Sequence, residues 1–105
     1  MMKKEKGSNI IGLAAKAGRT LIGKHQIGHA VRRNDEILVI IAKDAGKDIT
    51  DFLEITCQKH QVDFIKWCTK KVLGSALGKN EISAVAITDQ GLANKFIQNV
   101  RDLGF

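Results

Sequence analysis

Apolar residues recur along the chain with two spacings, one typical of helices and one typical of strands. A first helix is expected to run from a cap at Ser8 or Asn9 to a left-handed stop at Gly18. Its apolar face consists of Ile10, Ile11, Leu13, Ala14 and Ala17. Residues 1–7 carry three lysines and one glutamate, and they are expected to form a flexible basic tail.

The segment after Gly18 predicts a short strand, a second helix and a buried strand. Residues 20–22 form a brief extended piece, and a helix follows Gly23 over residues 25–33, ended by Asn34 and Asp35. Residues 37–42 are an unbroken run of isoleucine, leucine, valine and alanine. Such a run is typical of a strand buried on both faces, so it is expected at the centre of a sheet with parallel neighbours.

The rest of the chain continues the alternation of helices and strands. A turn at residues 44–48 precedes a helix over 49–60, and a strand is expected at 62–68. Thr69 can cap a short helix that is closed by Gly78, and a strand over 82–88 leads to a last helix capped by Asp89. The apolar stripe of this last helix is Leu92, Phe96, Val100 and Leu103.

This order of elements predicts a sheet sandwiched between helices. The length of 105 residues suits one domain with one modest core, so residues 1–105 are expected to form a single domain. The sequence contains no proline, no internal repeat and no low-complexity linker. No apolar run approaches the roughly 20 residues of a membrane span, and the charged start is unlike a signal peptide, so we expect a cytoplasmic protein.

The positive charge is concentrated in the first third of the chain. The net charge is +6, yet residues 1–33 hold eight lysines and arginines against one glutamate, whereas the other 72 residues hold nine bases and ten acids. A fold can gather such a surplus into one patch that attracts a polyanion. The alternative is a disordered basic tail together with scattered, solvated charge.

The second helix carries the most suggestive chemistry. From Arg19 to Arg33 there are four bases, two histidines and no acid. At 100° per residue, one face of this helix is apolar, and the opposite face holds His25, His29, Arg32 and Arg33. Gly23 and Lys24 at its start suit a phosphate, and His25 with Gln26 could reach base edges. The alternative is that Gly23 is only a turn and the helix only amphipathic.

Several other functional classes lack their residues. We find no phosphate-binding glycine loop, no HExxH motif and no serine or cysteine nucleophile with a nearby base in sequence, so no enzyme activity and no cofactor are expected. His25 and His29 lack a third metal ligand, and His60 with Cys57 and Cys68 matches no zinc pattern. Both cysteines are expected to be reduced, with Cys57 in the core.

Four runs of residues together resemble a known family. IIGLAAKAGRTLIGKHQIGHAVRRND, ILVIIAKDA, LGSALGKNE and AVAITDQG follow one another in an order and spacing similar to the kink-turn-binding superfamily of ribosomal proteins, the L-seven-Ae and L-thirty-e group. The first run and the last two look especially like the small bacterial members. The resemblance covers nearly the entire chain. It implies an α/β fold, a three-layer α/β/α sandwich with a mixed four-stranded sheet, and no catalytic activity.

The resemblance also implies a site for a sharply bent RNA with tandem sheared G·A pairs. Gly23 matches the family glycine, His25 and Gln26 occupy the positions that read the guanines, and His29 stands where a lysine usually contacts phosphate. Arg33 matches a basic family position, and the loop at residues 78–83 is the second contact. The candidate RNA-binding residues are Gly23, Lys24, His25, Gln26, His29, Arg33, Lys79 and Asn80.

We therefore expect a ribosomal or ribosome-associated protein that binds structured, kink-turn-like RNA, with ribosomal RNA as the partner, no membrane association and a monomeric state. The alternative is a protein-interaction module that keeps this fold without specific RNA recognition. In that case the acidic side chains Asp48, Asp51 and Glu54 would face a basic partner, although acids at a helix N-terminus are also explained by the helix dipole.

Overall fold

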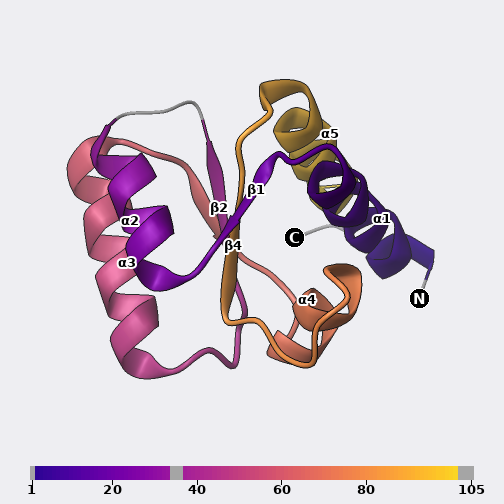
Figure 1. The fold of residues 1–105 in the computed structure, drawn as a ribbon, viewed down its shortest axis with the longest axis horizontal. Coiled ribbons are helices and arrows are strands. Elements are labelled where there is room, and N and C mark those ends of the chain that lie inside the picture. The colour runs from indigo at the N-terminus through magenta and orange to yellow at the C-terminus, as the bar shows by residue number, and fades with distance from the viewer. Residues whose placement is uncertain (1, 34–36, 102–105) are drawn as a thin grey trace.

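The computed structural model describes residues 2–33 and 37–101, with side-chain surroundings given for residues 7–33 and 37–100. Helices and strands alternate along the described chain, as the sequence predicted (Figure 1). They are α1 (Met2–Lys16), β1 (Thr20–Ile22), α2 (Lys24–Arg32), β2 (Leu38–Ile41), α3 (Lys47–His60), β3 (Phe64–Lys66), α4 (Lys70–Ala76), β4 (Ala84–Ile87) and α5 (Gln90–Arg101).

The four strands form one mixed sheet in the order β1-β4-β2-β3. β4 is antiparallel to both β1 and β2, whereas β2 and β3 are parallel. The register pairs Ile22 with Val85, Ile41 with Ala84, and Ile41 with Lys66. It follows that β1, β2 and β3 all point in the same direction.

The central position of β2 is confirmed, but only one of its neighbours is parallel. The reversed direction of β4 follows from α4, a helix of 7 residues after which the chain doubles back. The Lys79 N–H donates to the Gly74 carbonyl at 2.7 Å, and the Ile82 N–H donates to the Lys70 carbonyl at 3.0 Å. The chain therefore enters β4 at the edge of the sheet where β3 ended.

The helices form a layer on each face of the sheet, which confirms the three-layer α/β/α sandwich (Figure 1). α2 and α3 cover one face, and α1, α4 and α5 cover the other. Successive residues of β2 alternate between the two cores, because neighbouring side chains of a strand point to opposite faces. Leu38 and Ile40 pack under α1, α4 and α5, whereas Val39 and Ile41 pack under α2 and α3.

The first helix begins earlier than the sequence predicted. It starts at Met2, so residues 2–7, expected as a flexible tail, form its first turns. Lysine and glutamate favour helix there, and Gly7 is buried against two aromatic rings. A Cβ at Gly7 would lie 2.6 Å from Trp67 Cζ2, and Trp67 meets Phe96 edge to face at 5.0 Å. Leu13, expected on the buried face, is 56% exposed.

Most predicted helix boundaries are confirmed. The Thr69 hydroxyl accepts from the Val72 N–H at 3.2 Å, and Asp89 Oδ1 accepts from the Leu92 N–H at 2.9 Å. Gly18 has the left-handed φ of 70° expected of its stop. The strands are shorter than predicted: residues 62–63 and 67–68 lie outside β3. The predicted end of the second helix at residues 34–35 and the position of residue 103 lie outside the described residues.

Candidate nucleic-acid interface

Three helices begin at the same edge of the sheet. Because β1, β2 and β3 point in the same direction, the connections to α2, α3 and α4 all leave from one edge. The loop before β4 reaches this edge too, since β4 runs antiparallel to β2. We call this region, residues 23–26, 43–47, 68–71 and 78–83, the helix-start edge. In Figure 1 the starts of α3 and α4 lie at the bottom of the molecule, and α2 begins above them, below the strand labels.

The start of α2 has the features of an anion-binding turn. Gly23 is exposed with φ 102° and ψ 141°, a conformation that side-chain-bearing residues rarely adopt. No side chain caps the helix, so the N–H groups of its first turn keep their hydrogen-bonding capacity at the positive end of the helix dipole. Lys24 is half-buried, and His25 and Gln26 are exposed.

The other predicted residues divide into two groups. Lys79 and Asn80 are exposed in the loop before β4, and they lie at the helix-start edge with Gly23 to Gln26. His29 is exposed one turn further along α2. Arg33 is the residue that ends α2, and nine residues of helix span about 13 Å, so it lies at the far end of the helix from Gly23. The amphipathic pattern predicted for α2 is confirmed: Ile27, Ala30 and Val31 are buried.

Sequence reasoning missed three exposed or half-buried lysines at this edge: Lys43, Lys70 and Lys71. The Lys43 N–H donates to the Cys68 carbonyl at 2.8 Å, and Asp44 Oδ1 accepts from the Lys70 N–H at 2.7 Å. These bonds join the connection after β2 to the one after β3. The missed signal was strand direction: a residue that follows a strand shares an edge with residues that follow its parallel neighbours.

Two other lysines near this edge are neutralised by carboxylates. Lys47 Nζ lies 2.7 Å from Asp51 Oδ2, and this hydrogen bond and charge raise the pKa of Lys47 above its ordinary value. Lys66 Nζ lies 2.6 Å from Glu54 Oε2. We therefore do not count Lys47 and Lys66 among the cations available to a polyanion.

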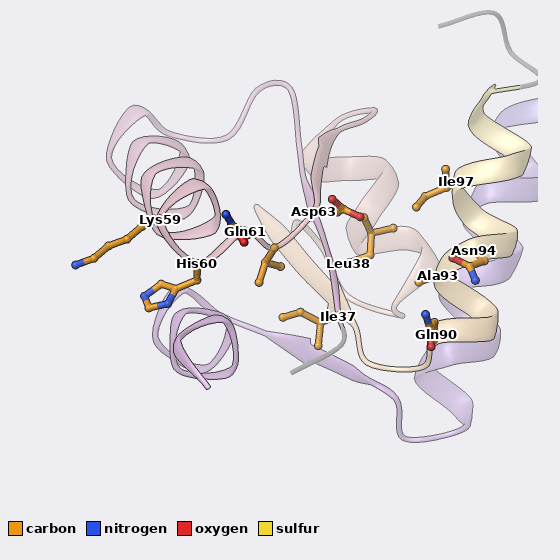
Figure 2. A pocket seen from close by; sticks show the side chains of 11 residues that line it. Ile37, Leu38, Lys59, His60, Gln61, Asp63, Gln90, Ala93, Asn94 and Ile97 are labelled. Carbon is orange, nitrogen blue, oxygen red and sulfur yellow. The ribbon is translucent and has the colours of Figure 1, made fainter. Parts of the chain in front are cut away.

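A groove of about 610 Å³ lies at the opposite edge of the sheet (Figure 2). Its lining comes from the start of β2, the end of α3, the chain before β3 and the first turns of α5, as the labelled side chains show. Exposed Lys59 and Asp63 give it one charge of each sign beside the carboxamides of Gln61, Gln90 and Asn94. The groove is therefore separate from the helix-start edge and is not enriched in cations.

The Cys57 thiol is not placed to act as a nucleophile. Cys57 and Cys68 are both buried, and burial raises the pKa of Cys57 from 9.0 to about 11. A thiol that stays protonated at neutral pH is a poor nucleophile. Within residues 2–33 and 37–101 no cluster of His, Cys, Asp and Glu could hold a metal ion, and no helix is long and apolar enough to cross a membrane.

Comparison with known proteins identifies the family of this chain. A family model described as "Ribosomal protein L7Ae/L30e/S12e/Gadd45 family" matches residues 5–97. The chain belongs to this family. The L7Ae/L30e/S12e/Gadd45 family is one of ribosomal and RNA-binding proteins and not an enzyme family.

Relatives within the L7Ae/L30e/S12e/Gadd45 family match over most of their length. The chain is 32% identical over 88 residues to "RNA-binding protein YlxQ" of Bacillus subtilis, covering 84% of this chain and 88% of that protein. It is 31% identical over 88 residues to "Large ribosomal subunit protein eL8" of Cenarchaeum symbiosum, covering 83% and 70%.

Solved structures show the same fold. A protein of unknown function from Bacillus halodurans matches with a TM-score of 0.86 and 30% identity, covering 91% of this chain and 97% of that one. The 15.5kD RNA binding protein of Giardia lamblia matches with a TM-score of 0.80 and 23% identity, covering 97% and 88%.

Proposed function

We propose that this chain is an RNA-binding protein of ribosomal type that binds structured, kink-turn-like RNA at the helix-start edge. The observation that carries the proposal is the placement of the uncapped start of α2 beside the loop before β4 at one edge of the sheet. The family and the RNA-binding relatives support it.

Each part of the edge has a chemical role in this proposal. The N–H groups after Gly23 and the cations Lys24 and Lys79 bind phosphate oxygens, which fixes the position of the RNA but reads no sequence. Gln26 offers a carbonyl acceptor to a guanine amino or imino group, and His25 supplies a second polar contact to the base pairs. Asn80 contacts a phosphate or a sugar of the RNA.

The missed lysines extend this role. Lys43, Lys70 and Lys71 widen the cationic surface from the start of α2 toward the starts of α3 and α4. Counterion release from each phosphate contact adds affinity without sequence preference. His29 lies on the side of α2 that faces the RNA, and Arg33 contacts the RNA backbone at the far end of the helix.

The experiment is a titration of two labelled RNAs of equal length, one with a kink-turn containing tandem G·A pairs and one a regular duplex. We expect the kinked RNA to bind more tightly at near-physiological salt. Gln26→Ala should weaken the kinked RNA selectively, whereas Gln98→Ala is a matched control because Gln98 is exposed on α5, on the other face of the sheet. Equal affinities that both collapse with salt would leave only nonspecific polyanion binding.

For the natural partner we propose ribosomal RNA, bound by a monomer in the cytoplasm. The support is the family and the ribosomal name of the archaeal relative. Crosslinking in the native cell followed by sequencing of the bound RNA should recover ribosomal fragments. Recovery of no RNA, together with a captured protein partner, would favour the interaction-module alternative.

A further inference from the structure

Phe52 of α3 brings together two cations of α2. Lys24 Nζ lies 4.8 Å from the centroid of the Phe52 ring, and Arg32 Cζ lies 5.6 Å from the same centroid. Both distances are within the range in which a cation is attracted to the face of an aromatic ring. Lys24 and Arg32 are eight residues apart, two turns along α2, so their side chains reach toward each other over one ring.

The ring can lie there only because residue 28 is a glycine. A Cβ at Gly28 would lie 2.9 Å from Phe52 Cε2 and 3.0 Å from Phe52 Cζ. Glycine inside a helix costs roughly 1 kcal/mol relative to alanine. The helix interior thus carries an unfavourable residue at the position where the Phe52 ring edge meets α2, midway between the two cations.

The ring holds these cations without neutralising them. No carboxylate among the described residues pairs with Lys24 or Arg32, in contrast to Lys47 and Lys66, which are paired with Asp51 and Glu54. A carboxylate that orders a cation also cancels its charge, whereas an aromatic ring orders it and leaves the charge available. Lys24 is half-buried and Arg32 is exposed, so both can meet a ligand from solvent.

We propose that Lys24, Phe52 and Arg32 form a phosphate-binding subsite along the junction of α2 and α3, with Phe52 as the positioning residue. The ligand is the phosphodiester backbone of one RNA strand, and the inference rests on the RNA-binding function proposed above. It adds Arg32 to the interface and directs the strand from the start of α2 along the flank of that helix that faces α3. Because the subsite contacts only phosphates, it acts on kinked and regular RNA alike.

The positioning role of Phe52 is tested with Phe52→Leu, which keeps an apolar side chain but has no ring face. The loss of cation–π attraction should weaken binding of both RNAs about two- to fivefold, with the salt dependence unchanged because both cations remain. In NMR spectra the Lys24 side-chain protons should be shifted upfield by the ring current in the unmodified protein and should lose that shift in the variant. Wild-type affinity in a variant shown by circular dichroism to be folded would overturn the positioning role.

Gly28→Ala separates positioning from stability. Alanine should improve the helix while its Cβ displaces the ring edge, so RNA affinity should fall although the unfolding temperature does not. A merely structural contact would instead show stability and affinity changing together, and that result would count against the inference.

The phosphate contact is tested with Arg32→Ala against Lys95→Ala, which removes the same charge from the exposed surface of α5 on the other face of the sheet. Arg32→Ala should reduce the slope of log affinity against log salt by about one, and Lys95→Ala should reduce it much less. Arg32→Ala should also cost less in the Phe52→Leu background than alone. Equal effects of Arg32→Ala and Lys95→Ala would overturn the subsite.

Failure of the subsite differs from failure of kink-turn recognition. If Arg32→Ala and Phe52→Leu bind as the wild type does while Gln26→Ala still weakens only the kinked RNA, the subsite fails and the proposed function stands. If the two RNAs bind equally but Arg32→Ala lowers both salt slopes, kink-turn recognition fails and the subsite stands.

Discussion

Replacing Gly74 by alanine should disturb the loop at the helix-start edge as well as the stability of the fold. Gly74 lies in α4, and a Cβ there would lie 2.5 Å from the Asn80 carbonyl oxygen, 2.7 Å from its carbon and 2.8 Å from the Glu81 nitrogen. All three are backbone atoms, so rotation of a side chain cannot relieve the contact. The loop must move by at least 0.9 Å for the shortest of these distances to reach the 3.4 Å of an ordinary contact.

The net effect is the difference between two opposing contributions. Alanine in a helix gains up to ~1 kcal/mol over glycine, and overpacking of a close contact costs about 1–3 kcal/mol. Because the contact is with backbone atoms, the cost should fall in the upper part of that range, about 2–3 kcal/mol. We therefore expect Gly74→Ala to lower the free energy of unfolding by about 1–2 kcal/mol, and each kcal/mol should lower the melting temperature by roughly 4–8 °C. RNA affinity should also fall, because Lys79 and Asn80 move with the loop.

Chemical unfolding of Gly74→Ala alongside Gly12→Ala isolates the contact. A Cβ at Gly12, in α1, would meet only the Ala76 carbonyl oxygen at an ordinary 3.5 Å. Gly12→Ala should therefore stabilise the protein by up to ~1 kcal/mol. If Gly74→Ala is as stable as Gly12→Ala and binds RNA as the wild type does, the reasoning about the α4 contact is refuted.

Three further changes test single features. Asp89→Ala removes the acceptor for the Leu92 N–H and should lower stability by about 0.5–2 kcal/mol in thermal unfolding, whereas Asp89→Asn, which keeps an acceptor, should change it little; equal losses would contradict the cap. Gly23→Ala imposes a side chain at φ 102° and should cost about 1–3 kcal/mol, and an unchanged melting temperature would contradict the strain. Burial raises the pKa of Cys57 from 9.0 to about 11, so between these pH values the Cys57 thiol ionises only in the unfolded chain. The free energy of unfolding should therefore fall in this pH range by up to ~1.4 kcal/mol per pH unit. Cys57→Ala should reduce this dependence of stability on pH, and an unaltered slope would refute the assignment to the Cys57 thiol.

Features set by neighbouring residues could be predicted from the sequence. The apolar run of β2 predicts a buried central strand and that of β4 predicts a strand, and both strands are buried throughout. Thr69 and Asp89 cap their helices because the cap bonds an N–H three residues further on, so the whole motif lies within four residues. The start of α2 and its exposed polar face could be predicted for the same reason.

Features set by contacts between distant segments could not be predicted from local patterns. The early start of α1 depends on Gly7 packing against Trp67, sixty positions along the chain. The strand order and the reversal before β4 determine which residues lie at the same edge of the sheet. They therefore place Lys43 and Lys70 at the same edge as the start of α2. The close approach of the Phe52 ring to Gly28 likewise depends on how α3 packs against α2.

The central claim, that RNA binds at the helix-start edge, is tested most directly by titrating isotope-labelled protein with kink-turn RNA and following its backbone amide resonances. We predict that the largest shifts fall on residues 23–26 and 79–83, with the amides lining the groove at residues 59–63 unchanged. Shifts concentrated at the groove, or no localised shifts at saturating RNA, would contradict the claim.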